Sequence, residues 1–329
     1  MLRRLLLAAA VMPMLLAATH FASAQEKLRL AWAGFSPTNS PIWVIDDRKL
    51  LQRMGVEPEI IAINASPTVL QALLADEIDA ASISVTTLVS SRLQGADTVM
   101  IVGVVPTFVD HIVSLGSITK IEQLKGKVAG VNRLGSTSDL GLRLALKKLG
   151  IDPDKDVKII PTGGTAERLA ALSKGLTQFT IIPEPFLTQA EKLGLHNLYN
   201  ISALKIPFWW NGILTRESII KSRRPLMLKL ARAVVEAIYI IKTDKEYAKA
   251  LFRKHLGVTD PEGLERAYKD YSNVFPEVPY PNPDGVKTML DDLAPKNPKA
   301  AAADPKTFVD MSLIRELDSS GFIKQLYRR

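Results

Sequence analysis

The feature that most constrains the fold is a series of short apolar runs, rich in β-branched residues, that alternates with helical patterns and then starts again. The first four apolar runs, which predict strands, are Lys27–Ala33, Glu57–Ile63, Ala80–Val85 and Thr98–Val105. The helical patterns between them are Ser40–Met54, Pro67–Ala75 and Thr87–Gln94. Alternation of this kind predicts a parallel sheet covered by helices.

The series restarts near Lys120. Its second set of predicted strands is Lys127–Val131, Val157–Pro161 and Gln178–Ile182. The second set of predicted helices is Ser138–Leu149, Ala166–Lys174 and Glu184–Leu193. In each half a strand, a polar or glycine-containing turn, a helix and a second strand follow in the same order. This order suggests a distant repeat, although any two βαβ units share it.

Two apolar segments, Val105–Leu115 and Ile201–Leu214, predict crossings between two lobes. We therefore expect a first lobe over residues 25–108, a second lobe over 109–205, and a return to the first lobe over 206–329. The return is mostly helical, with an extended proline-rich loop over Phe275–Pro283. Its predicted helices are Leu226–Ile241, Asp244–His255, Pro261–Asn273, Asp284–Leu293 and Pro305–Ser319.

The first 24 residues have the layout of a secretory signal peptide. Two arginines precede the apolar run Leu5–Leu16, and Ala22-Ser23-Ala24 is a small-residue cleavage site. We expect cleavage after Ala24 and location in the periplasm. The alternative, an uncleaved anchor, is less favoured because the apolar run is short for a membrane span.

Composition and motifs argue against several classes of function. The chain has no cysteine, which excludes disulfides, thiolate nucleophiles and cysteine-based metal sites. Its net charge of +8 is spread along the chain, so nucleic acid is not an expected partner. The histidines lack metal-binding spacing, and G-x-S-x-G, H-E-x-x-H and Walker-A patterns are absent. We expect no enzyme activity, no cofactor and no metal.

Small and hydroxyl residues recur where a predicted helix follows a strand. These turns are Ser36–Pro41, Ser84–Thr87, Gly135–Ser138 and Gly163–Thr165. Each leaves unpaired backbone N–H groups and a partial positive charge at the helix start. Most such turns in proteins are helix caps and nothing more. Because they occur at strand ends in both halves, however, we expect them to face one cleft and to hold a small, polar, anionic ligand.

Two further stretches have alternative interpretations. Glu184, just past a strand, either caps the next helix, lines the cleft or pairs with a cationic group of the ligand. Trp209 and Trp210 are adjacent, so on a strand they face opposite ways and one of them can face the cleft. We take Glu184 and Trp209 as candidate ligand contacts.

Four segments resemble the periplasmic substrate-binding proteins of ABC transporters, of the nitrate, sulfonate and taurine type. Binders of the thiamine pyrimidine precursor belong to the same group. The segments are SPIWVIDDRKLLQRMGVEPEII, LQALLADEIDAASIS, LKGKVAGVNRLGSTSDLGLRLALKKLGIDPDKDV and GGTAERLAALSKG. The resemblance covers most of Leu28 to Arg216, and its most specific part is Leu124–Lys127 with the following Gly-Ser-Thr-Ser turn.

The resemblance implies a two-lobed periplasmic binding protein fold (type II-like) that closes on its ligand. It also implies delivery to an ABC permease. We expect the protein to be monomeric and non-catalytic. The expected ligand contacts are Phe35, Ser36, Asn39, Ser84, Thr86, Gly135, Ser136, Thr137, Glu184 and Trp209. Ser84-Val85-Thr86 stands where the family often has smaller residues, and Glu184 suits a bare inorganic anion poorly. An organic anion such as a sulfonate or carboxylate is therefore expected.

Two alternatives remain open at this point. The first is an enzyme on the same fold, similar to the thiamine-pyrimidine synthases. The absence of cysteine and the signal peptide argue against it. The second is a ligand-sensing partner of a membrane receptor or of another transporter class.

Overall fold

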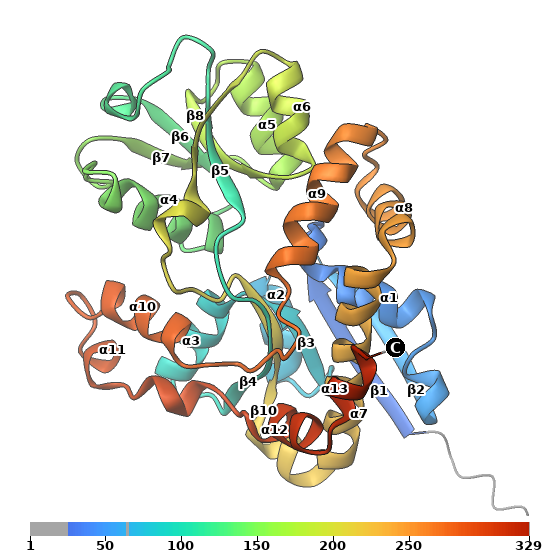
Figure 1. Ribbon diagram of the computed structural model, residues 1–329. Coiled ribbons are helices and arrows are strands. Elements are labelled where there is room, and N and C mark those ends of the chain that lie inside the picture. The colour runs from blue at the N-terminus through green and yellow to red at the C-terminus, as the bar shows by residue number, and fades with distance from the viewer. Residues whose placement is uncertain (1–25, 64–65, 329) are drawn as a thin grey trace, which may run out of the picture.

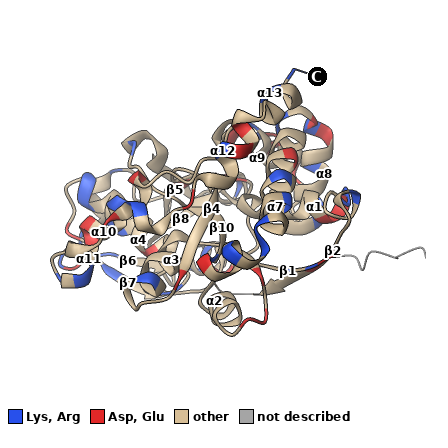
Figure 2. Cartoon of the chain, turned by 90° about the horizontal axis from the view of Figure 1, so that it is seen from below, with Lys and Arg blue, Asp and Glu red and all other residues tan. Residues whose placement is uncertain are grey.

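The computed structural model describes residues 26–63 and 66–328, and they form two α/β lobes joined by two crossings (Figure 1). The predicted signal peptide, residues 1–24, lies outside the described residues. None of the described helices is both long enough and apolar enough to cross a membrane. Lys and Arg are interspersed with Asp and Glu over both lobes (Figure 2).

The first lobe is built on a five-stranded sheet in the order β2-β1-β3-β10-β4. Its strands are β1 (Glu26–Ala33), β2 (Val56–Ile63), β3 (Ala80–Ile83), β4 (Thr98–Val105) and β10 (Asn211–Arg216). The elements between them are η1 (Pro37–Asn39), α1 (Ser40–Asp47), η2 (Gln52–Met54), α2 (Ser66–Leu74) and α3 (Val85–Leu93). Strand β1 pairs in parallel with β2 and β3, whereas β10 is antiparallel to β3 and β4.

The second lobe repeats this arrangement in a sheet of order β7-β6-β8-β5-β9. Its strands are β5 (Asp110–Ser114), β6 (Val128–Val131), β7 (Lys158–Pro161), β8 (Phe179–Pro183) and β9 (His196–Asn200). Its helices are η3 (Ile121–Leu124), α4 (Thr137–Lys148), α5 (Thr165–Ser173), α6 (Phe186–Lys192) and η4 (Ile201–Leu204). Strand β6 is parallel to β7 and β8, and β5 is antiparallel to β8 and β9. The prediction of two mostly parallel sheets flanked by helices is confirmed.

Both crossings end in a strand that joins the lobe it enters. The chain leaves the first sheet after β4 and enters the second as β5, then leaves after β9 and returns as β10. In both sheets the entering strand occupies the fourth position and runs antiparallel to its neighbours. Each crossing therefore places its last residues beside the strand ends of the lobe it enters.

The C-terminal helices pack against the first lobe and also reach the second. They are α7 (Glu217–Thr243), α8 (Lys245–Leu256), α9 (Pro261–Val274), α10 (Asp284–Leu293), α11 (Pro298–Ala302), η5 (Pro305–Phe308), α12 (Ser312–Ser319) and α13 (Phe322–Leu326). Figure 1 shows α9 beside α6 of the second lobe, and the two helices are in contact.

Two predicted helices are wrong in extent. Ser40–Met54 is not one helix, because Lys49 adopts a left-handed conformation (φ 54°) that ends α1, and a separate 3₁₀ turn follows. Pro305–Ser319 is also interrupted: Val309 forms a parallel bridge to Met100 of β4, so the backbone is extended between η5 and α12. The predicted Leu226–Ile241 helix lies within the longer α7, which has a kink at Arg223, two residues before Pro225.

Candidate functional site

The two lobes enclose a cavity of about 220 Å³ at the ends of their strands. Its lining comes from the turns after β1, β3 and β6, from the starts of α2, α3, α4 and α5, and from the two crossings. This volume is at the small end for a ligand site, so the cavity suits a small molecule.

Three of the helices that start at the cavity have N-cap residues in its lining, and these helices come from both lobes. Ser84, Ser136 and Gly164 are the N-cap residues of α3, α4 and α5, and all three line the cavity. The first turn of a helix has N–H groups without intrahelical partners and a partial positive charge. The three helix starts together therefore give the cavity a preference for an anionic group.

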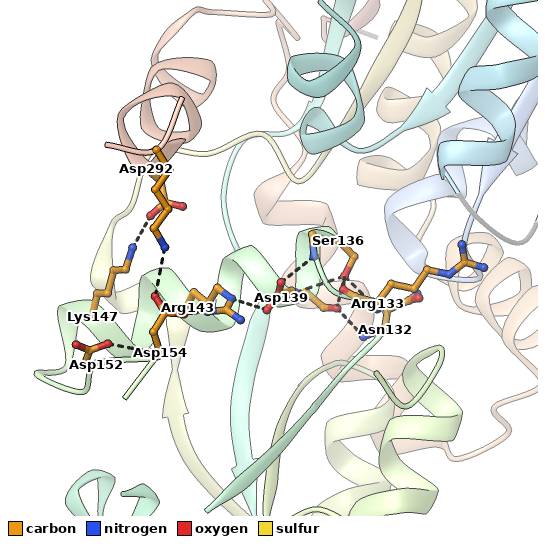
Figure 3. Close-up of polar contacts among 12 residues, drawn as sticks. Asn132, Arg133, Ser136, Asp139, Arg143, Lys147, Asp152, Asp154 and Asp292 are labelled. Atoms are coloured by element: carbon orange, nitrogen blue, oxygen red, sulfur yellow. Dashed lines mark hydrogen bonds and ion pairs between the residues drawn. The ribbon is translucent and has the colours of Figure 1, made fainter. Parts of the chain in front are cut away.

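The turn before α4 is fixed by its own side chains (Figure 3). The Ser136 hydroxyl donates to the Arg133 carbonyl oxygen at 2.6 Å and caps the Asp139 N–H at 3.4 Å. The Asp139 carboxylate accepts from the Gly135 N–H at 2.8 Å and from Arg143 Nε at 2.7 Å. The hydrogen bonds of the Ser136 hydroxyl therefore stabilise the turn itself.

Other hydroxyls of the helix starts remain available to a ligand. Thr137 is 8 % exposed and lines the cavity, and its hydroxyl has no hydrogen-bond partner among the described residues. Across the cavity, the Ser84 hydroxyl is within 2.9 Å of that of Thr86 and 3.1 Å of that of Thr87. All three first-lobe hydroxyls belong to residues that line the cavity.

Asn39 lies beneath the cavity wall rather than in it. Its amide nitrogen donates to the carbonyl oxygens of Ala33 and Gly34 at 2.9 and 2.7 Å. Its amide oxygen accepts from Ser82 at 2.8 Å and from Asn211 at 3.0 Å. Asn39 is 1 % exposed, so its predicted ligand contact is corrected to support of the turn after β1.

Apolar side chains also line the cavity. Phe35 of the first lobe and Leu134 of the second are 54 % and 60 % exposed, and both line the cavity. Trp210 lines it as well and packs edge-to-face on Phe108. Three apolar groups around a polar centre suit an organic ligand better than a bare ion.

Three charged residues line the cavity. Arg133 and Leu134 are exposed at the turn before α4, and the Arg133 side chain points away from that helix (Figure 3). Arg168, in the first turns of α5, is 4 % exposed. Asp110, the first residue of β5, is fully buried, and burial raises its pKa to about 7 while Arg168 opposes the shift.

Glu184 does not line the cavity. Its carboxylate accepts from the Thr188 N–H and hydroxyl, at 3.1 and 2.9 Å, inside the first turn of α6. Its other oxygen, Oε1, lies 2.6 Å from Arg266 Nε of α9, an ion pair between the second lobe and the C-terminal helices. Glu184 therefore has the helix-capping role, and its predicted ligand contact is corrected.

Trp209 also points away from the cavity. It is 2 % exposed, its indole N–H donates to the Asn282 carbonyl oxygen at 2.7 Å, and its ring fills the space above Gly103 and Gly285. A Cβ atom at Gly103 would lie 2.2 Å from this ring. The two tryptophans do face opposite ways, but Trp210 is the one at the cavity.

Of the ten predicted contacts, the structure places seven in the cavity lining: Phe35, Ser36, Ser84, Thr86, Gly135, Ser136 and Thr137. The lining residues that the sequence reasoning missed include Asp110, Arg168, Trp210 and Asn211. The sequence contains a signal that could have identified Asp110, since it is a lone acid in an apolar run. Arg168 had one too, three residues after the Gly-Gly-Thr turn.

Comparisons with known proteins agree with this architecture. A model of the NMT1-like family matches residues 21–253. YtlA of Bacillus subtilis (strain 168), a candidate binding protein, is 22 % identical over 264 residues, which cover 78 % of each chain.

Solved structures share the fold at low sequence identity. A protein of Bordetella bronchiseptica RB50 is 19 % identical with a TM-score of 0.76, and the match covers 89 % of this chain and 97 % of that one. The alkanesulfonate-binding protein SsuA of Xanthomonas axonopodis pv. citri, bound to MOPS, is 17 % identical with a TM-score of 0.71 and coverages of 87 % and 98 %. The fold is the two-lobed periplasmic binding protein fold.

Proposed function

The chain belongs to the NMT1-like family, and from this premise we propose that it is an exported solute-binding protein. In this proposal the protein captures a small organic anion between its lobes and delivers it to an ABC permease at the inner membrane. The protein acts as a monomer in the periplasm after loss of residues 1–24. It has no catalytic role.

One observation supports this function most strongly. The starts of α3, α4 and α5 meet at one cavity, together with Arg133 and Arg168. Helix starts and guanidinium groups both stabilise anionic oxygens. Because α3 belongs to one lobe and the other two helices to the second, an anion between them contacts both lobes at once.

The same geometry supplies the mechanism. A ligand that contacts both lobes stabilises the closed arrangement more than the open one, so its binding shifts the population toward closure. Ion pairs outside the cavity lining also join the second lobe to the C-terminal segment: Lys147 of α4 to Asp292 of α10 at 2.5 Å (Figure 3), and Lys192 of α6 to Asp260 at 2.6 Å. Exposed pairs of this kind contribute little free energy to closure.

An organic sulfonate or carboxylate is the solute class that fits best. The likeness to SsuA, an alkanesulfonate-binding protein, favours a sulfonate. The apolar side chains of Phe35, Leu134 and Trp210 provide surfaces for a carbon skeleton, which nitrate lacks.

The test is a ligand screen on protein stripped of any bound solute. The mature chain is unfolded, dialysed and refolded, and small sulfonates, carboxylates, nitrate and pyrimidines are then examined by thermal shift and calorimetry. A solute at 100 times its dissociation constant adds about 2.7 kcal/mol of stability. If no small solute binds, or if a bound solute is chemically converted, the proposed function is wrong.

A further inference from the structure

One buried carboxylate at the cavity has no partner. Asp110 begins β5, opposite Pro183 of β8, and its side chain is fully buried and lines the cavity. Neither carboxylate oxygen has a hydrogen-bond partner among the described residues. Among the acidic residues that the structure describes, only Asp110 lines the cavity.

The nearest cation does not satisfy this carboxylate. Arg168 donates through Nε to the Ile181 carbonyl oxygen at 3.2 Å and through its terminal nitrogens to Gly163 O and Thr165 Oγ1, at 3.4 and 3.1 Å. It is close enough to Asp110 to oppose the rise of that carboxyl's pKa, but it donates no hydrogen bond to the carboxylate. Three of the five N–H groups of Arg168 are therefore already used to hold α5 against β8.

The second titratable neighbour of Asp110 is Tyr271 of α9. Its pKa is raised well above the ordinary value, first by burial and then by the Asp110 carboxylate. The Tyr271 hydroxyl, also fully buried, has no hydrogen-bond partner among the described residues. Asp110 of β5 and Arg168 of α5 thus line the cavity, and Tyr271 of α9 is buried behind them, yet neither neighbour donates a hydrogen bond to the Asp110 carboxylate.

A buried carboxylate without donors is costly, and chains keep such a group where a ligand supplies what is missing. The geometry points to a solute that is a zwitterion: its cationic nitrogen donates to Asp110, while its sulfonate or carboxylate lies at the helix starts and Arg133. This inference rests on the proposed function and narrows it from an organic anion to an amino-bearing one. Asp110 is then the residue that determines specificity for the nitrogen.

Matched solutes test the inference on the unmodified protein. The pairs are taurine with ethanesulfonate, β-alanine with propionate, and 3-guanidinopropionate with butyrate. Because a hydrogen bond to a charged group contributes about 1.5–3 kcal/mol, the amino or guanidino member of at least one pair should bind at least about 10-fold more tightly. Equal affinity within every pair that binds would overturn the inference while leaving the proposed function intact. No binding by any member, together with no binding in the wider screen, would overturn both.

The variant Asp110→Asn tests whether Asp110 causes the preference for amino-bearing solutes. The variant should lose the amino preference by at least about 10-fold, while its affinity for the amino-free partner changes by less than about 3-fold. Glu184→Gln is the matched control, because Glu184 is a buried acid of the same lobe that lies outside the cavity. It should keep the preference. A preference that survives in Asp110→Asn would show that another group recognises the nitrogen.

The melting temperature of the unliganded protein tests the inference independently of ligand binding. An unpartnered carboxylate costs stability in the empty protein, so unliganded Asp110→Asn should melt at a higher temperature than the parent at pH 8. A lower melting temperature would show that Asp110 holds the fold through donors, and the inference would fail.

Discussion

Arg266 of α9 places its Nε 2.6 Å from Oε1 of Glu184, a carboxylate that is 1 % exposed in the other lobe. The same guanidinium donates to Glu191 of α6 through Nη1 at 2.6 Å. One side chain of the C-terminal helices thus holds two acids at the start and the end of α6. Burial raises the pKa of Glu184 to about 7, against the effect of Arg266.

Removal of this arginine should destabilise the protein in a pH-dependent way. Arg266→Ala leaves Glu184 buried without its cation, which costs about 3–5 kcal/mol at pH 8. At pH 5.5 the carboxyl takes up a proton at little cost, so the loss should be smaller. Urea unfolding at both pH values measures the difference, with Lys192→Ala as a control whose more exposed pairs are worth less than about 1 kcal/mol. An equal loss at both pH values would argue against this role for Glu184.

Asp110 should give the unliganded protein a stability that falls as the pH rises. Its pKa is about 7 in the folded protein and near 3.8 in the unfolded chain, so the folded state binds more protons between these values. The free energy of unfolding therefore decreases through this window. Urea titrations at pH 5, 6, 7 and 8 should show a shallower decrease in Asp110→Asn. A slope unchanged from the parent would mean that Asp110 does not titrate in this range.

Substitutions of the two tryptophans of the return crossing should have different effects, one mainly on stability and the other mainly on ligand affinity. Trp209→Ala opens a cavity over Gly103 and Gly285 and should cost about 3–5 kcal/mol. Trp210→Ala should cost less stability but weaken the solute's affinity, because its ring lines the cavity. Thermal melts and calorimetry with the solute from the screen test both. The reverse pattern would place Trp209 at the ligand.

Neighbouring hydroxyls at the start of α4 should also behave differently. Ser136→Ala removes a helix cap and should cost about 1 kcal/mol of stability. Thr137→Val keeps the side-chain shape and removes a hydroxyl that has no partner among the described residues, so it should weaken binding with little change in melting temperature. If Thr137→Val binds the solute as well as the parent does, the Thr137 hydroxyl is not a ligand contact.

Much of this architecture follows from the sequence alone. The predicted strands from Lys27 to Ile182 correspond to β1–β4 and β6–β8 with shifts of one or two residues at their ends. Hydroxyl and glycine residues before helices also indicated which strand ends face the cavity. Periodicity and capping are local properties, so one chain is enough to reveal them.

Antiparallel strands β5, β9 and β10 were not predicted as strands. The apolar segments that contain β5 and β10 were interpreted as crossings, and His196–Asn200 had no assignment. These strands pair with partners far away in sequence, such as Asp110 with Pro183 and Gly212 with Ile83. Pairing over such separations leaves no local pattern, and only the folded sheet shows it.

The directions of individual side chains also follow partly from the sequence and partly from tertiary packing. Trp209 and Trp210 precede β10 rather than lie on it, so strand alternation does not govern them, and the space above Gly103 decided which of them is buried in the core. Helix-start chemistry allowed Glu184 to be a cap, yet Arg266, 82 positions later, decided its pairing. The sequence determined where anionic oxygens can be held, because helix starts are local. Tertiary packing alone decided that Asp110 is buried beside them without a partner, since burial and missing donors depend on β5, α5 and α9 together.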